Sequence, residues 1–379
     1  MSLVAEDRLE RNFTYEFASG ALVPVLAVVF ALIIGGLVVL AAGSNPINGY
    51  VQLAEGAFGG VYNISETLVA AIPLMLTGLA VAFAFRGGLF NIGAEGQFTA
   101  GAILSTYVGI SVDLPGILLI PLAMLAGAAA GAFWAGIAGL LKAWRGAHEV
   151  ITTMMLSYTS ILILYYLVQS SPTGAPGPMA QRFQVGVPET PPAHAFLPII
   201  IPGWLIKNDR LSLGLLIALA AAVLFWFLLW RSTVGYKIRA VGLNQKAAGY
   251  AGINVGGQIV LTMIIAGALA GLGGMVEVFG LAPYTLTWDF SSGFGFTAIA
   301  VALLGRNNAV GTILAAILFG AFVHGGAIMQ ANANISTHLV DMVQGLIIFF
   351  IGADALIRYL ARHGYVHLPL WRRERVMVP

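Results

Sequence analysis

Long apolar runs alternate with short polar connections along the whole chain. A helix of about 20 apolar residues is long enough to cross a bilayer. Eight such runs occupy residues 21–42, 64–85, 114–141, 149–170, 211–230, 257–280, 309–330 and 338–359. Two further apolar segments, 90–110 and 291–305, are less regular or shorter. The pattern predicts an all-α polytopic membrane protein with about ten transmembrane helices.

Basic residues are concentrated in alternate connections. If all ten segments cross, Arg182, Lys207 and Arg210 are the only three of the 18 Lys and Arg residues that lie on the side opposite the termini. Cytoplasmic loops carry an excess of Lys and Arg, so both termini are expected in the cytoplasm. The predicted parts are a cytoplasmic segment 1–20, a transmembrane domain 21–360 with an external loop 171–210 and a cytoplasmic loop 232–256, and a basic cytoplasmic tail 361–379.

The predicted crossings fall into two similar blocks. Residues 64–170 and 257–359 hold four crossings each. Five crossings separate corresponding members, so the two blocks run in opposite directions through the membrane. Inverted repeats of this kind are common in transporters, where the substrate path lies at the repeat interface. The pattern therefore predicts an inverted repeat.

Glycine pairs within the runs predict close helix packing. Gly127 and Gly131 lie in one run, and Gly267 and Gly271 lie in another. Small residues four positions apart let two transmembrane helices approach closely. We therefore interpret both pairs as structural.

The composition excludes several classes of protein. The chain is 59% hydrophobic and 9% charged, with a mean hydropathy of +0.90. A soluble domain carries roughly a quarter charged residues. The chain contains no cysteine, which excludes disulfides and thiol catalysis. It has no G-x-x-x-x-G-K-[ST] motif and no His/carboxylate pair with metal-ligand spacing, so we expect neither an ATPase, nor a metal site, nor an enzyme.

A polar, glycine-rich stretch, residues 87–97, interrupts the apolar pattern. Asn91 is expected to cap the helix that follows, and Glu95 to lie in its first turn, where the helix dipole favours a carboxylate. Non-helical backbone at membrane depth is tolerated only against protein or a watery cavity. Two interpretations therefore remain open. The stretch is either a capped helix start or a broken helix whose Asn91, Glu95 and Gln97 line a substrate path.

Three motifs together resemble a known family. They are FNIGAEGQ (90–97), G-Y-K-I-R-A-V-G-x-N-x-x-A-A-x-x-x-G-I (235–253) and G-F-G-F-T-A-I-A-V-A-L-L-G-R (293–306). In this order they resemble the permease subunits of binding-protein-dependent bacterial ABC importers, in the branched-chain amino acid, ribose and nucleoside group. The resemblance covers roughly residues 20–360. It is closest to nucleoside and simple-sugar permeases that work with basic-membrane-protein lipoproteins.

The resemblance implies a function and a set of partners. The chain is expected to be a multi-pass protein of the bacterial inner membrane that forms a path for nucleosides. A separate ABC ATPase would bind ATP and Mg and drive transport, while this chain would bind no cofactor. The other expected partners are a second, homologous permease, an extracytoplasmic substrate-binding lipoprotein and membrane lipid, with no nucleic acid. Three alternatives remain: an importer of ribose or another simple sugar, an ion-coupled secondary transporter, and a membrane-embedded scaffold or enzyme, against which the low charge and the lack of a catalytic constellation argue.

The cytoplasmic segment 235–253 has the features of a short docking helix. Asn244 is a suitable N-cap and Gly252 a suitable C-terminal stop. Ala247, Ala248 and Ala251 are expected to form a flat face, and the resemblance implies that this coupling helix inserts into a groove on the ATPase. The alternative is a basic loop that only obeys the topology rule. The residues assigned to the contact are Gly242, Asn244, Ala247, Ala248, Ala251, Gly252 and Ile253.

Aromatic residues and glycines precede the shortest predicted crossing, in residues 288–296. Phe294 and Phe296 are candidates to stack on a flat heterocycle, and Asp289 is a candidate to accept ribose hydroxyls. An aromatic belt at the membrane interface explains Trp288 equally well. These three candidates complete the expected substrate path.

Overall fold

The computed structural model describes residues 24–169, 175–182, 189–200, 210–291 and 293–362, with side chains described up to residue 351. Within these ranges the chain is helical and forms no named β-strand. The predicted segment 1–20 and nearly all of the tail 361–379 lie outside the described residues. The helices are Pro24–Ala41, α2 (Pro46–Phe58), α3 (Val61–Arg86), α4 (Ala94–Ser111), α5 (Gly116–Arg145), α6 (Glu149–Val168), α7 (Pro178–Arg182), α8 (Gly214–Arg231), α9 (Thr233–Leu243), α10 (Gln245–Tyr250), α11 (Val255–Gly280), α12 (Phe294–Leu304), α13 (Ala309–Ala333) and α14 (His338–Arg362).

Seven of the described helices are long and apolar enough to cross a membrane. The all-helical, multi-pass prediction is therefore confirmed for this part of the chain. Three further predicted crossings correspond to α4, α12 and α14, which do not reach the same length and hydropathy within the described residues. The apolar pattern did not predict α2. The seven are Pro24–Ala41, α3, α5, α6, α8, α11 and α13.

The chain divides into two compact units. The first comprises residues 1–46 and 341–379, and the second comprises residues 47–340. In the first unit, the helix Pro24–Ala41 contacts α14 through the rings of Phe30 and Phe350, whose centroids are 5.8 Å apart. The second unit holds all the segments that the sequence singled out for function.

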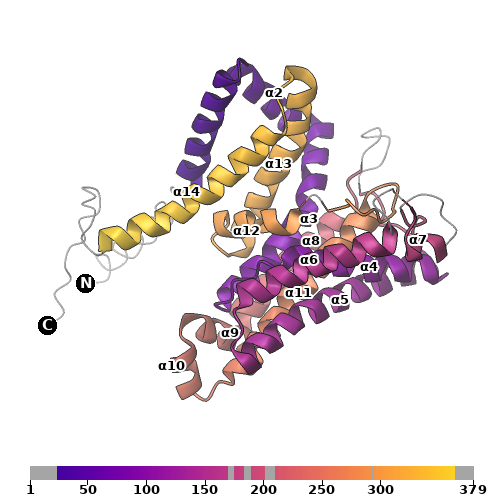
Figure 1. Ribbon diagram of the computed structural model, residues 1–379, viewed down its shortest axis with the longest axis vertical. Helices are drawn as coiled ribbons and strands as arrows, with labels where there is room; N and C mark the ends of the chain where they lie inside the picture. Colours follow the sequence, from indigo (N-terminus) through magenta and orange to yellow (C-terminus); the bar gives the residue numbers. More distant parts are fainter. Residues whose placement is uncertain (1–23, 170–174, 183–188, 201–209, 292, 363–379) are drawn as a thin grey trace, which may run out of the picture. The chain divides into compact units, whose positions relative to one another are not determined.

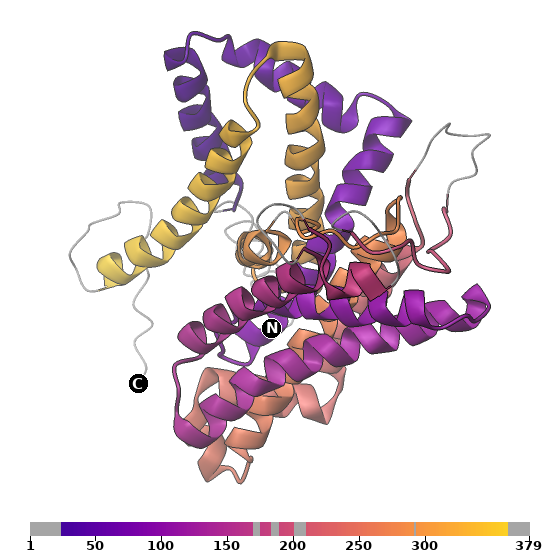
Figure 2. The same cartoon turned by 45° about the vertical axis from the view of Figure 1, so that its right-hand side comes forward.

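Two long helices, α3 and α11, form the centre of the second unit (Figures 1 and 2). In their most apolar stretches, 83% of the α3 residues and 67% of the α11 residues are buried, against 22% in α5 and α6. α3 packs against α12 and α13, while α11 packs against α4 and α5. Each central helix therefore packs against helices that lie far from it in the sequence.

Glycines allow α5 and α11 to touch backbone to backbone. A Cβ atom on Gly271 would lie 2.9 Å from the Cα atom of Gly131, and one on Gly127 would lie 3.1 Å from the carbonyl oxygen of Gly271. A Cβ atom on Gly267 would also clash with the carbonyl oxygen of Gly131. The structural interpretation of both glycine pairs is confirmed.

The basic connections of the second unit gather at one end. The Arg86 side chain, at the end of α3, donates hydrogen bonds to the carbonyl oxygens of Asn307 (2.7 Å) and Arg306 (3.2 Å) in the turn before α13. Lys142 and Glu149 form an ion pair of 2.6 Å across the α5–α6 turn. Figure 1 shows α9 and α10 projecting at this end, away from α7.

The segment 189–200 covers the opposite end. The backbone amide of His194 donates to the carbonyl oxygen of Gly109 in α4 (3.0 Å), and that of Leu197 donates to Phe279 in α11 (2.8 Å). Arg210 forms a two-point ion pair with Glu66 of α3. The segment 189–200 is thus attached to the ends of α4 and α11, and Arg210, which lies outside this segment, contacts α3 near its start.

Candidate functional site

The segment before α4 is held together by its own amides. Asn91 and Gln97 exchange two side-chain hydrogen bonds of 3.0 Å, and the backbone amide of Gly93 donates to Asn91 Oδ1 at 3.0 Å. Both amide side chains are buried. The N-cap of α4 is Gly93. The expectation that Asn91 caps this helix is therefore wrong, because its side chain fixes the preceding turn instead.

Glu95 joins the start of α4 to the start of α12. It lies in the first turn of α4, as predicted, and its side chain is 2% exposed. Its carboxyl group accepts hydrogen bonds from the backbone amide of Gly295 (2.7 Å) and from the Ser291 hydroxyl. The N-cap of α12, Gly293, makes no side-chain cap. Glu95 thus caps α12 from another helix, at the end where the dipole favours negative charge.

The two helix starts are in close contact. A Cβ atom on Gly295 would clash with the α4 backbone at Ala94 and Glu95. Beside this contact, the ring of Phe98 stacks on Phe290 with centroids 5.3 Å apart and planes 8° apart. Phe98 also packs edge-on against Phe294 at 5.9 Å. We call this region the α4–α12 junction; it comprises Asn91, Gly93, Glu95, Gln97, Phe98, Phe290, Ser291, Phe294 and Gly295.

The structure divides the predicted path residues into two groups. Asn91, Glu95, Gln97 and Phe294 come together in the junction, where protein groups contact each of them. Asp289 is exposed on the connection before α12, and Phe296 is 36% exposed on α12 itself. Sequence reasoning missed the partners of these residues. Phe98 looks like any aromatic residue in an apolar run, and Phe290 lay unremarked within the segment 288–296.

The predicted caps of the cytoplasmic helix are present. Asn244 Oδ1 accepts a hydrogen bond from the amide of Ala247 at 3.0 Å, so Asn244 is the N-cap of α10. The helix ends at Tyr250, and Gly252 has a φ of +78°. The amide of Ile253 then donates to the carbonyl oxygen of Ala248 at 3.0 Å. Gly252 therefore stops the helix as predicted.

The predicted alanine face is only partly exposed. Ala247 and Ala251 are exposed, but Ala248 is 4% exposed and belongs to a cluster with Val241 and Met263. The expectation that the three alanines share an outward face is therefore wrong. A helix of six residues with few large side chains gives no pattern that fixes its orientation.

Two large side chains, which sequence reasoning missed, dominate the exposed surface of the tip. Leu243 is 88% exposed and Tyr250 is 94% exposed. Ile253 is half-buried against the Ala248 cluster, and Gly242 packs against the turn at Gly88. We call the exposed residues Leu243, Ala247, Tyr250 and Ala251 the α10 tip.

Cation–π contacts brace α9 beneath the tip. The guanidinium group of Arg239 lies 4.2 Å from the ring centroid of Trp230 in α8, and that of Arg86 lies 5.7 Å from the same centroid. Contacts of this kind are attractive within about 6 Å. Trp230 therefore links α8, α9 and the end of α3.

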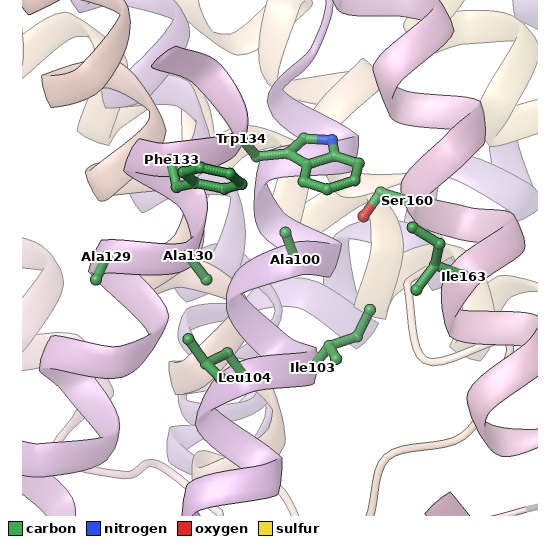
Figure 3. A pocket seen from close by; sticks show the side chains of 9 residues that line it. All are labelled: Ala100, Ile103, Leu104, Ala129, Ala130, Phe133, Trp134, Ser160 and Ile163. Carbon is green, nitrogen blue, oxygen red and sulfur yellow. The ribbon is translucent and has the colours of Figure 1, made fainter. Parts of the chain in front are cut away.

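An apolar pocket of about 310 Å³ opens on the side of the bundle between α4, α5 and α6 (Figure 3). Ser160 of α6 supplies the one hydroxyl group among the lining side chains, and it points toward α4. The indole Nε1 of Trp134 donates to the carbonyl oxygen of Leu156 at 3.0 Å. The pocket is lined by Ala100, Ile103, Leu104, Ala129, Ala130, Phe133, Trp134, Ser160 and Ile163.

Three known proteins resemble the chain over most of its length. It is 40% identical to the guanosine ABC transporter permease protein NupP of Bacillus subtilis, over 90% of this chain and 96% of NupP. It is 38% identical to the nucleoside ABC transporter permease protein NupB of Lactococcus lactis, over 89% of this chain and 92% of NupB. It is 36% identical to the glucose ABC transporter permease protein TsgB13 of Haloferax volcanii, over 86% of each chain.

Second permeases of the same two bacteria match less closely. NupQ of Bacillus subtilis, also a guanosine permease by name, is 31% identical over 68% of this chain, and NupC of Lactococcus lactis is 27% identical over 68%. Residues 63–352 match a family model, and this matched range includes both α4 and the α10 tip. The chain belongs to the family described as the permease component of the branched-chain amino acid transport system.

Proposed function

We propose that this chain is the permease subunit of an ABC importer and forms a path for nucleosides across the bacterial inner membrane. The observation that carries the proposal is the similarity to NupP and NupB along nearly the whole of each chain. The match to the glucose permease TsgB13 supports a second candidate, an importer of a simple sugar. Two nucleoside permeases at 40% and 38% identity, against one glucose permease at 36%, favour nucleosides.

The charges inside the bundle also suit an uncharged cargo. Glu66 and Glu95 are buried acidic side chains, and protein groups hold both of them. Glu277 of α11 is half-buried and interacts electrostatically with Arg210. A branched-chain amino acid would need fixed groups for its carboxylate and its ammonium group. A nucleoside needs hydroxyl partners and a flat apolar surface instead.

The topology that goes with this function has ten crossings, both termini in the cytoplasm and an inverted repeat over residues 64–170 and 257–359. The reciprocal packing of α3 on α12 and α13, and of α11 on α4 and α5, supports the repeat. The clustering of Arg86, Arg306 and Arg239 at one end supports a cytoplasmic assignment for that end. A transmembrane domain of 21–360 follows from the same topology.

Within this scheme the predicted path residues take two roles. Asn91, Glu95, Gln97 and Phe294 position the starts of α4 and α12, because their contacts are made within the protein. Phe296 and Asp289 are exposed and remain the candidates for contact with the substrate. A break in two helices at membrane depth is the arrangement by which many transporters build a substrate site.

The α10 tip binds the ATPase, which holds the ATP and Mg that this chain does not bind. Exposed Leu243 and Tyr250 supply apolar area for that contact, and Ala247 and Ala251 permit close approach. A second permease completes the path, as the pairs NupP and NupQ, and NupB and NupC, suggest. An extracytoplasmic lipoprotein delivers the substrate to the end covered by residues 189–200.

The test is uptake by proteoliposomes that contain this chain with the ATPase, second permease and binding protein of its own organism. We expect ATP-dependent uptake of labelled guanosine that unlabelled nucleosides inhibit and that glucose and leucine do not. Uptake of branched-chain amino acids without nucleosides would overturn the proposal. Uptake of glucose alone would establish the second candidate, and uptake that persists without the ATPase but stops with an ionophore would identify a secondary transporter.

A further inference from the structure

One face of α6 is exposed along the whole helix. Its large residues recur three or four positions apart and lie 54% to 67% exposed, while Thr153, Ser157 and Ser160 on the other side are buried. Thr159 is also exposed beside this row. The row consists of Ile151, Met155, Tyr158, Leu162 and Tyr166.

Tyr158 and Thr159 lie near the middle of the span. The Lys142–Glu149 ion pair marks one end of α6, and the helix ends at Val168. At 1.5 Å per residue, Tyr158 is about 14 Å from either end. The hydrocarbon core of a bilayer is about 30 Å thick, so its edges are out of reach of a tyrosine side chain at this position.

Other exposed helix faces at the same depth are apolar. Val223 near the middle of α8 is 65% exposed, and Phe133 and Leu125 of α5 are each 69% exposed. These residues suit hydrocarbon chains, whereas the Tyr158 phenol in hydrocarbon would lose its hydrogen bonds to water. The Thr159 hydroxyl donates to the carbonyl oxygen of Met155 at 2.9 Å, so its oxygen serves as an acceptor only. In transmembrane helices, polar groups at this depth face protein or a watery cavity. The α6 face therefore differs in chemistry from the faces of α5 and α8.

The helix α6 is also tied to the α4–α12 junction, through residues that lie outside the exposed row. The amide of Gly96 in α4 donates to Ser157 Oγ at 3.2 Å. The ring of Tyr165 packs edge-on against Trp288, with centroids 6.2 Å apart, on the connection that leads to α12. Asp289 follows Trp288 directly. The helix that carries the mid-span hydroxyls thus adjoins the segment with the exposed candidate Asp289.

We infer that the exposed face of α6 lines the water-filled path and that Tyr158 and Thr159 contact the nucleoside as it passes. This inference rests on the proposed function and names the surface that meets the substrate. The ring of Tyr158 offers a flat face for the base, and the hydroxyl groups of Tyr158 and Thr159 suit the ribose hydroxyls. The second permease closes the path on the opposite side.

The absence of cysteine from the chain makes a direct test possible. Tyr158→Cys, Thr159→Cys and, as a matched control, Val223→Cys would each carry one thiol at mid-span in the complete transporter. During ATP turnover in proteoliposomes, a charged, membrane-impermeant methanethiosulfonate is added, and the mass of this chain is measured. We expect the cysteines at 158 and 159 to react at least about tenfold faster than the one at 223, because thiolate forms readily only in water. We also expect guanosine to slow both reactions.

Each outcome separates this inference from the proposed function. If guanosine uptake is normal but the cysteines at 158 and 159 react no faster than the one at 223, the α6 face contacts lipid or the second permease, and the inference is overturned. If they react quickly and glucose, not guanosine, slows them, the path assignment stands and the nucleoside assignment falls. Fast reaction that neither solute slows overturns the contact with substrate.

A second variant tests the hydroxyl of Tyr158. Tyr158→Phe keeps the ring and removes one hydrogen-bonding group, so we expect the KM for guanosine to rise roughly 2- to 10-fold with little change in kcat. Tyr166→Phe makes the same chemical change near the end of the span, where water can replace the lost partner. An unchanged KM for Tyr158→Phe would overturn the role of this hydroxyl.

Discussion

Gly88 and Gly242 meet backbone to backbone: a Cβ atom on Gly88 would lie 2.8 Å from the Cα atom of Gly242. Gly88 lies in the turn between α3 and α4. Gly242 is the last residue but one of α9, the helix that precedes α10. The contact joins the α10 tip to the segment that leads to Glu95. We expect this packed backbone to carry movement of the tip to the α4–α12 junction.

A methyl group at Gly88 should separate these elements. Gly88 has a φ of +73°, and Gly146 has a φ of +66° with nothing within 4 Å of an added Cβ atom. Gly146→Ala should lower the free energy of unfolding by about 1–2 kcal/mol, the cost of a left-handed conformation. Gly88→Ala should cost about 1–3 kcal/mol more, because its Cβ atom also clashes. Thermal unfolding in detergent measures the difference, and equal losses in both variants would contradict the contact.

Glu95 should matter more as an acceptor than as a charge. Glu95→Ala leaves the buried amide of Gly295 without its partner, which we expect to cost about 1–3 kcal/mol and to abolish guanosine uptake. Glu95→Gln keeps one carbonyl oxygen as an acceptor, so it should lose less stability and less guanosine uptake than Glu95→Ala. Asp289→Asn changes an exposed carboxylate nearby and should leave stability unchanged. A Glu95→Ala variant as stable as Asp289→Asn would show that the cap of α12 contributes nothing.

The apolar runs located most of the helices, because a helix in lipid must be apolar over its whole length. They did not reveal α2, whose 13 residues mix glycine, Gln52 and Glu55 with apolar side chains. The caps of α10 were predictable because an N-cap acts on residues two or three positions ahead. The cap of α12 was not, since Glu95 and Gly295 are 200 residues apart.

The site was predictable in residue identity but not in role. The sequence indicated Asn91, Glu95 and Gln97 because polar residues are rare in a chain that is mostly apolar. It gave no sign that their hydrogen-bonding groups bind one another and α12. Tyr158 was overlooked because it lies within an ordinary apolar run, and only the exposed fraction of its side chain distinguishes it.

Removing Arg210 and removing Glu66 from their ion pair should lower the stability of the protein by unequal amounts. The Glu66 side chain is 2% exposed and that of Arg210 is 53% exposed. Hydrogen bonding to Glu66 raises the pKa of Arg210 above its usual value, so the guanidinium group stays charged at any working pH. Arg210→Gln leaves a buried carboxylate unpaired, whereas Glu66→Gln leaves a guanidinium group that water can solvate.

We therefore expect Arg210→Gln to cost about 1–3 kcal/mol, less than the 3–5 kcal/mol typical of a fully buried pair, because Arg210 is half exposed. Glu66→Gln should cost less than Arg210→Gln. The double variant should recover part of the loss, since it leaves no buried charge. Thermal unfolding of the three variants measures the asymmetry, and a larger loss for Glu66→Gln would contradict it.

The two neighbouring alanines of α10 should distinguish docking from folding. Ala247 is exposed, so Ala247→Glu should leave thermal unfolding unchanged while it weakens co-purification with the ATPase and lowers ATP-dependent uptake. Ala248 lies within the cluster that contains Val241 and Met263, so Ala248→Glu would bury a carboxylate without a partner. Burying a charge in this way is strongly unfavourable, so Ala248→Glu should unfold at a lower temperature.

Tyr250→Ala provides an independent test, because it removes an exposed ring from the α10 tip without placing a charge there. If Ala247→Glu and Tyr250→Ala both bind the ATPase and transport guanosine normally, the ATPase binds some other surface of the cytoplasmic end.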